Sequence, residues 1–155
     1  MIDVGVIGSN STRRTNELIE ATIFYAKSLM PPEVVDALEI DVIISHDLTH
    51  AGCAYPDVDD VNPRSFIIEL NPKYADPSIY STLAHEMVHV KQWAMGEAND
   101  RLGVDGGDIV IQRMWQGKEW TPGDNEDYYF DCPWEIEAFG REVGLYYRWR
   151  NRNSK

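Results

Sequence analysis

The chain is poor in cysteine, histidine and positive charge, and it has no long apolar run. Two of its 155 residues are cysteine, Cys53 and Cys132, and only four are histidine. No export signal is visible, so a cytoplasmic location is expected. In that compartment the two cysteines are expected to be thiols and not to form a disulfide. No stretch of about 18 apolar residues occurs, so no membrane-spanning helix is expected.

Basic residues are scarce beside acidic ones, 14 against 26, which gives a net charge of −12. An acidic surface repels nucleic-acid phosphates and anionic membranes, so neither is an expected partner. Five tryptophans and eight tyrosines exclude a disordered chain, because disorder goes with few aromatic residues. The length suits one domain spanning residues 1–155.

The hydrophobic pattern predicts an α+β fold with a small mixed sheet. Strands are expected at 2–7, 40–44, 65–70 and 108–115, and helices at 15–30, from Asp76–Pro77 to Gly96, and at 133–150. Gln116-Gly117 is expected to turn the chain into a short hairpin. The stretch 52–60 is expected to be a loop. The sheet should pack on the middle helix, whose apolar stripe is Leu83, Met87, Val90 and Ala94.

The middle helix carries His85-Glu86-Met87-Val88-His89, the segment most informative about chemistry. Histidines at i and i+4 lie on one helix face, one turn apart, so their rings can converge on a single ion. Zinc accepts such nitrogen ligands in a tetrahedral shell. A glutamate at Glu86 can reach a water on that ion and act as general base.

A catalytic zinc needs a third protein ligand and an open position. All four histidines lie at or before His89, so the third ligand is a downstream carboxylate or an upstream histidine. His46 and His50 follow a predicted strand and are not expected to bind metal. Glu135 and Glu137 on the last helix are the candidates. They lie about 200° apart around that helix, so only one can face the metal.

The His-Glu-x-x-His motif followed by Glu135-x-x-Ala138 resembles the gluzincin metallopeptidases. The order of elements is similar to the compact core of SprT-like and related minimal gluzincins, some of them phage-encoded. The resemblance implies a zincin-like fold and a Zn²⁺ ion held by His85, His89 and Glu135, with Glu137 as the rival third ligand. Many gluzincins have an aspartate after the small residue, where this chain has Phe139.

The expected function is therefore zinc-dependent hydrolysis of a peptide or protein substrate, with Glu86 as general base. Candidate donors to the developing oxyanion are Tyr128, Tyr129 and Tyr146. A substrate could add as a strand beside Phe66–Leu70. The alternatives are a zinc hydrolase of another amide and a catalytically silent, metal-stabilised binding or accessory protein. A structural site has no use for Glu86, which favours an enzyme.

Overall fold

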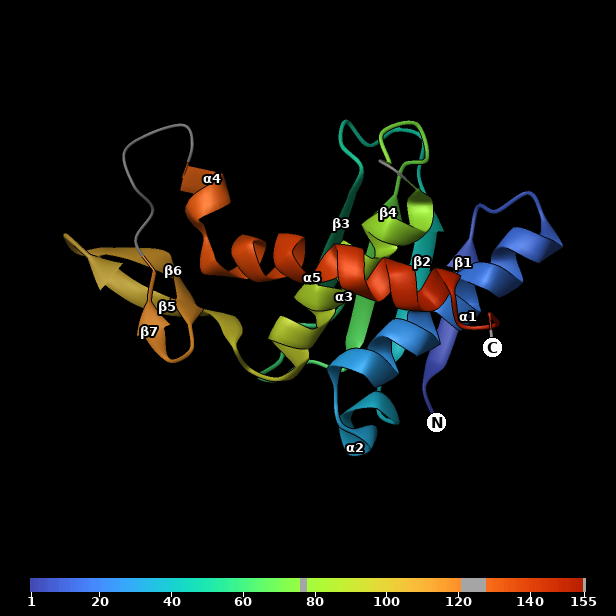
Figure 1. The fold of residues 1–155 in the computed structure, drawn as a ribbon. Coiled ribbons are helices and arrows are strands. Elements are labelled where there is room, and N and C mark those ends of the chain that lie inside the picture. The colour runs from blue at the N-terminus through green and yellow to red at the C-terminus, as the bar shows by residue number, and fades with distance from the viewer. Residues whose placement is uncertain (76–77, 121–127, 155) are drawn as a thin grey trace.

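The protein is a mixed α+β structure with two small sheets and a C-terminal pair of helices (Figure 1). The computed structural model describes residues 1–75, 78–120 and 128–154. The α+β class predicted from the sequence is confirmed. No helix within these ranges is both long and apolar enough to cross a membrane. Both cysteines carry thiols, as predicted.

The first sheet has four strands in the order β1-β2-β4-β3, with bounds β1 (Asp3–Ile7), β2 (Glu39–Ile44), β3 (Gly52–Pro56) and β4 (Ser65–Leu70). Strands β1, β2 and β4 run parallel to one another, whereas β3 pairs antiparallel with β4. The prediction of a loop at 52–60 was wrong for residues 52–56, because β3 is a strand. The proposed substrate edge at 66–70 was also wrong, because β4 is flanked on both sides.

Helix α1 (Thr12–Leu29) links β1 to β2 and is followed by the short α2 (Pro32–Val35), which the sequence did not predict. The side chain of Ser11 accepts a hydrogen bond from the Arg14 amide and caps α1, which begins at Thr12, three residues before the predicted start. Proline at 31 and 32 ends α1 where expected.

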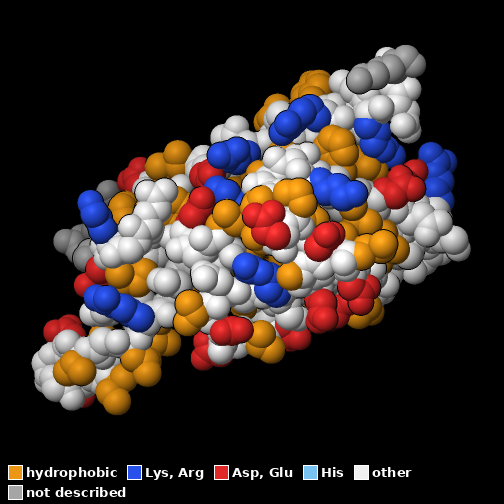
Figure 2. All heavy atoms as spheres, turned by 90° about the horizontal axis from the view of Figure 1, so that it is seen from below, with side chains coloured by type: hydrophobic (Ala, Val, Ile, Leu, Met, Phe, Trp, Pro, Cys, Tyr) orange, Lys and Arg blue, Asp and Glu red, His pale blue; other side chains and the backbone are white. Residues whose placement is uncertain are grey.

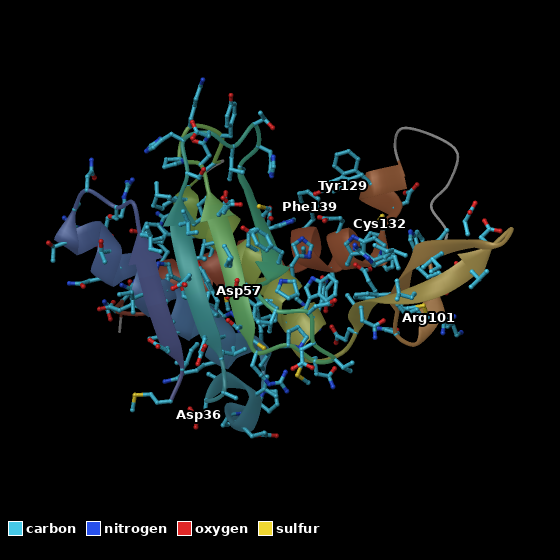
Figure 3. All side chains as sticks on the ribbon, turned by 180° about the vertical axis from the view of Figure 1, so that it is seen from behind. Asp36, Asp57, Arg101, Tyr129, Cys132 and Phe139 are labelled. Carbon is cyan, nitrogen blue, oxygen red and sulfur yellow. The ribbon has the colours of Figure 1, made fainter. Side chains whose placement is uncertain are left out.

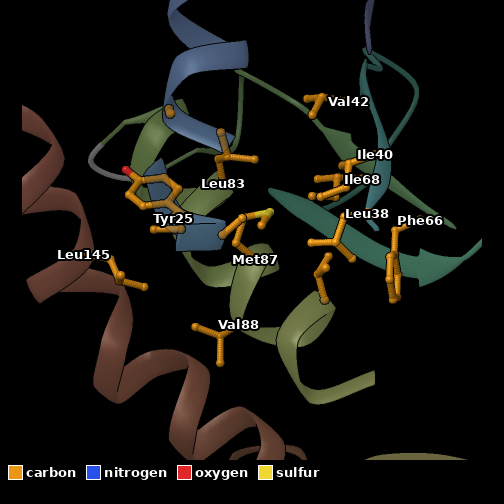
Figure 4. Packing of buried hydrophobic residues seen from close by; sticks show 14 of the residues in the cluster. Tyr25, Leu38, Ile40, Val42, Phe66, Ile68, Leu83, Met87, Val88 and Leu145 are labelled. Carbon is orange, nitrogen blue, oxygen red and sulfur yellow. The ribbon is translucent and has the colours of Figure 1, made fainter. Parts of the chain in front are cut away.

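The core lies between one face of this sheet and helices α1, α3 (Ile79–Ala94) and α5 (Pro133–Arg150). Alternate side chains of β2 and β4 point inward, and the predicted stripe of α3 is wholly buried. Figure 4 shows Met87 of α3 among these strand residues. Because α5 also packs on α3, the middle helix is buried on nearly all sides.

Helix α3 begins later than predicted. Ser78 caps it by accepting a hydrogen bond from the Tyr80 amide, while Asp76 and Pro77 lie outside the described residues. Gly96, at a φ of 71°, follows the end of the helix as predicted. Helix α5 has the predicted bounds, and the four-residue α4 (Tyr128–Asp131) precedes it.

The second sheet is a hairpin of β5 (Ala98–Asp105) and β6 (Asp108–Trp115), extended by β7 (Lys118–Glu119). Gln116 and Gly117 both have positive φ and form the predicted turn between β6 and β7. The longer pairing of β5 with β6 was not predicted. Gly106 and Gly107, also at positive φ, make its tight turn. The hairpin projects from the body of the molecule (Figure 1).

Candidate metal centre

Helix α3 directs His85, Glu86 and His89 towards α5 and β3, which pack on it. The two imidazole rings lie 5.0 Å apart between centroids, in a T-shaped arrangement. His85 is 9% exposed and Glu86 is 5% exposed. The i, i+4 spacing thus places both rings side by side on one face of α3, as the motif predicts.

Glu135 in the first turn of α5 completes a cluster with these histidines. Its Oε2 lies 3.2 Å from His85 Nε2 and its Oε1 lies 3.2 Å from His89 Nε2. Across the described ranges, His85, His89 and Glu135 form the group that could hold a metal ion, with ligand atoms within 4.8 Å of one another. Ligands of a tetrahedral zinc at 2.0–2.1 Å stand roughly 3.3 Å apart, so the two nitrogen-to-oxygen distances of 3.2 Å are close to the spacing that such an ion requires.

The second nitrogen of each ring is held by a further side chain. His85 Nδ1 lies 2.7 Å from Glu142 Oε2, and His89 Nδ1 lies 2.9 Å from Gln92 Oε1. The Gln92 amide nitrogen donates to the Trp134 carbonyl oxygen and to Glu137, so its oxygen faces His89. Acceptors at both Nδ1 atoms leave both Nε2 atoms facing the Glu135 carboxylate, where they can bind a metal ion once they have lost their protons, as metal-binding histidines do.

Glu142 is the acceptor that orients His85, whereas Phe139, at the position where many gluzincins have an aspartate, has no such role. Phe139 instead packs its ring against His85, 4.6 Å between centroids. The motif comparison did not identify Glu142, although it stands seven residues after Glu135. Seven residues are close to two helical turns, which puts both carboxylates on one face of α5.

Glu137, the rival third ligand, lies away from the histidines. Its carboxylate accepts hydrogen bonds from Lys91 Nζ at 2.8 Å, Gln92 Nε2 at 3.0 Å and Arg141 Nε at 3.0 Å. Lys91 also pairs with Glu97, 2.7 Å away. Glu137 therefore joins α3 to α5 through ion pairs, and its lone pairs are directed away from the cluster.

The charges of the cluster are strongly coupled. Burial opposes charge on His85, yet hydrogen bonds with Glu135 and Glu142 raise its pKa to about 9. Burial likewise opposes charge on Glu135, yet hydrogen bonds with His85 and His89 lower its pKa to about 2. A dication would replace the imidazole protons as the partner of this carboxylate. Burial also raises the pKa of Glu86 to about 6, although both histidines oppose the rise.

An open groove of about 1180 Å³ runs past the cluster. Strand β3 and the acidic residues Asp57, Asp59 and Asp60 line one side, and the base of the hairpin lines the other. Figure 3 labels Asp57 and Arg101 on these two sides. His50 also lines the groove but is not part of the described metal cluster.

The three tyrosines proposed as oxyanion donors fall in different places. Tyr129 lines the groove, and burial together with the neighbouring Glu135 carboxylate raises its pKa. Tyr146 packs against the core instead. The side chain of Tyr128 lies outside the described part of the structure.

Strand β3 passes close to the carboxylate of Glu86. A Cβ atom placed on Gly52 would lie 3.2 Å from Glu86 Oε1, 3.0 Å from Thr82 Cγ2 and 3.1 Å from the Glu69 carbonyl oxygen. The absence of a side chain at Gly52 therefore leaves the space in which Glu86 lies. This requirement is a property of the fold and could not be read from the motif.

No protein-family model matches the chain, and searches of curated proteins and of solved structures likewise give no match.

Proposed function

We propose that the protein is a zinc-dependent metallopeptidase with a gluzincin-like, zincin-type site. The convergence of the two histidine Nε2 atoms on one buried carboxylate carries the proposal, because two imidazoles and a carboxylate make a donor set typical of catalytic zinc. The ligand count leaves a further position for water or substrate. A mixed sheet with an antiparallel outer strand, packed on the helix with the two histidines, supports the zincin-like reading.

Zinc at this site would polarise both an attacking water and a substrate carbonyl. Glu86 would accept the water's proton at its carboxylate and pass that proton to the leaving amine. Its place in the wall of the groove, directly beside the first histidine, suits a base that takes and releases a proton next to the bound ion. The phenol of Tyr129 would donate to the developing oxyanion.

An extended peptide would bind along β3. This strand ends the order of the first sheet and lines the groove, and no further described strand pairs with its outer side. A peptide pairing there by main-chain hydrogen bonds would run past Glu86, whose carboxylate adjoins Gly52. The sequence suggested that a substrate strand would add beside β4; we now propose that it adds beside β3.

Substitution of Glu86 by glutamine tests this function. Glu86→Gln should lower hydrolysis of a quenched fluorescent peptide library at least about 100-fold, because the general base is removed. Zinc content, measured by elemental mass spectrometry, should stay at the wild-type value, since Glu86 is not a ligand. Glu33→Gln, at an exposed position on α2, is the matched control and should change neither property.

Hydrolysis that survives Glu86→Gln would contradict the proposed mechanism. A zinc-loaded wild-type protein that cleaves neither the peptide library nor other amides would favour the metal-stabilised binding protein instead.

A further inference from the structure

One face of the projecting hairpin carries four large aliphatic side chains that are open to solvent. Leu102 lies opposite Ile111, and Val104 lies opposite Ile109, so the four share a face. Their exposed fractions are 76%, 74%, 72% and 77%. We call these four residues the hairpin stripe. Hydrophobic atoms are visible on the projecting lobe at the lower left of Figure 2. A contiguous exposed apolar patch of this kind marks an interaction surface.

The hairpin stripe continues the lining of the groove. Two residues nearer the base, the same face carries Asp100 opposite Arg113, and both line the groove, together with Asn99 and Arg101 of the other face of β5. At about 3.4 Å per residue, the stripe reaches roughly 14 Å beyond Arg113. A chain lying in the groove and leaving on this side therefore meets the stripe next.

The base of the hairpin is tied to the turn of α5 that carries Glu135. The ring of Trp134 lies 6.2 Å from that of Trp115 and 5.8 Å from that of Trp120, between centroids. The Arg113 guanidinium lies 5.3 Å from the centroid of the Trp134 ring. These contacts fix the root of the stripe relative to the metal cluster.

The size of the stripe indicates what covers it. Four aliphatic side chains at these exposures present about 100 Å² each, or roughly 400 Å² in all. A stable interface between folded proteins takes about 800 Å² from each partner. The stripe is half that size and instead suits about four residues of an extended chain.

We propose that the hairpin stripe is a second binding site for the polypeptide that occupies the groove, and that it takes an aliphatic segment beyond the cleaved bond. The identity of this ligand as a substrate rests on the proposed function. The substrates are then unfolded or extended chains rich in aliphatic residues, long enough to span both the groove and the stripe. Short peptides fill the groove alone.

The test measures binding, in a zinc-loaded Glu86→Gln background that cannot cut the probe. Ile109→Thr/Ile111→Thr removes apolar groups from the stripe but keeps β-branched residues, which suit a strand. The control is Ile7→Thr/Val110→Thr, which makes two aliphatic-to-threonine exchanges outside the stripe, one on β1 and one on the opposite, partly exposed face of β6. Fluorescein-labelled β-casein, an unfolded aliphatic-rich chain, is the probe in fluorescence anisotropy.

The stripe variant should bind casein about tenfold more weakly, whereas the control should bind it as the parent does. A labelled five-residue peptide should bind all three proteins equally. Equal casein binding by the stripe variant and the control would overturn the proposal, as would no casein binding by the parent. So would a dimer in sedimentation that the stripe variant abolishes without weakening casein binding, since a second copy would then cover the stripe.

Failure of the proposed function has a different signature. Zinc-loaded wild-type protein that binds casein through the stripe, yet cleaves neither casein, the peptide library nor other amides, would support the stripe and refute the hydrolase.

Discussion

At the scale of single residues, the candidate site depends on acceptors that orient the histidine rings. Each ring has one nitrogen held by Glu142 or Gln92 and the other directed at Glu135. A ring fixed at both nitrogens loses little freedom on binding an ion, so the site is preorganised for metal. The two orienting residues come from α5 and α3 and hold the cluster from both sides.

Loss of Glu142 should weaken the binding of zinc. Glu142→Ala removes the acceptor at His85 Nδ1, and the apparent affinity for zinc, measured by competition with a chromophoric chelator, should fall about 10–100-fold. Glu142→Gln keeps an acceptor oxygen and should recover part of the loss. Val143→Ala, at the next and exposed position of α5, is the control. Unchanged affinity in Glu142→Ala would show that the contact does not orient the ring.

The pKa of Glu137 leads to a prediction about stability and pH. Burial acts to raise this pKa, but hydrogen bonds from Lys91 and Gln92 prevail and hold it below the ordinary value of 4.5. The ionised form therefore stabilises the fold above that value, and its contribution is lost as the pH falls through the folded-state pKa.

Glu137→Gln should therefore lower the free energy of unfolding by roughly 1.5 kcal/mol at pH 7. The difference from wild type should shrink as the pH falls below about 4.5. Urea denaturation of both metal-free proteins, from pH 7 down to about pH 4, measures this. A difference that stays constant over the whole range would mean that the charge of Glu137 is not what stabilises the fold.

Sequence spacing was sufficient to propose His85, Glu86 and His89. It left Glu135 and Glu137 open as the third ligand, and the gluzincin resemblance favoured Glu135, which the structure brings together with both histidines in the wall of the groove. Spacing was not sufficient for the residues that orient these ligands. Whether Glu142 reaches His85 depends on how α5 crosses α3, which is decided by tertiary packing rather than by the period of either helix.

At the scale of elements, strand β3 shapes the site although its sequence does not look like a strand. Gly52, Ala54 and Pro56 have low strand propensity, and only pairing with β4 makes the segment extended. Strand β5 was missed for the same reason, because Asn99, Asp100 and Gly103 are poor strand formers. By contrast, α3 and α5 have strong periodicity or a proline start, and the sequence predicted both helices.

A side chain at Gly52 should impair catalysis without removing the metal. In Gly52→Ala the new Cβ would crowd Thr82 and the Glu86 carboxylate, so we expect kcat to fall about tenfold while zinc content is unchanged. Ala54→Gly, two residues along the same strand, is the control for altered strand stability. Wild-type kcat in Gly52→Ala would show that Glu86 does not need this space.

At the scale of the whole molecule, both sheets contribute to the groove that passes the buried cluster. The four-stranded sheet supplies β3, the hairpin supplies the opposite wall of the groove, and α3 and α5 supply the side chains of the cluster. Three acidic residues of the groove, Asp57, Asp59 and Asp60, add to a net charge of −12 and favour cations near its entrance. The central claim is that the cluster binds zinc.

Zinc content tests that claim most directly. Wild-type protein purified without chelator, Glu135→Ala and Glu137→Ala should be compared by elemental mass spectrometry. We predict close to one zinc per chain in wild type and in Glu137→Ala, and almost none in Glu135→Ala, because only Glu135 faces both histidines. A wild-type protein that holds no zinc even after reconstitution, or a Glu135→Ala protein that retains it, would contradict the account.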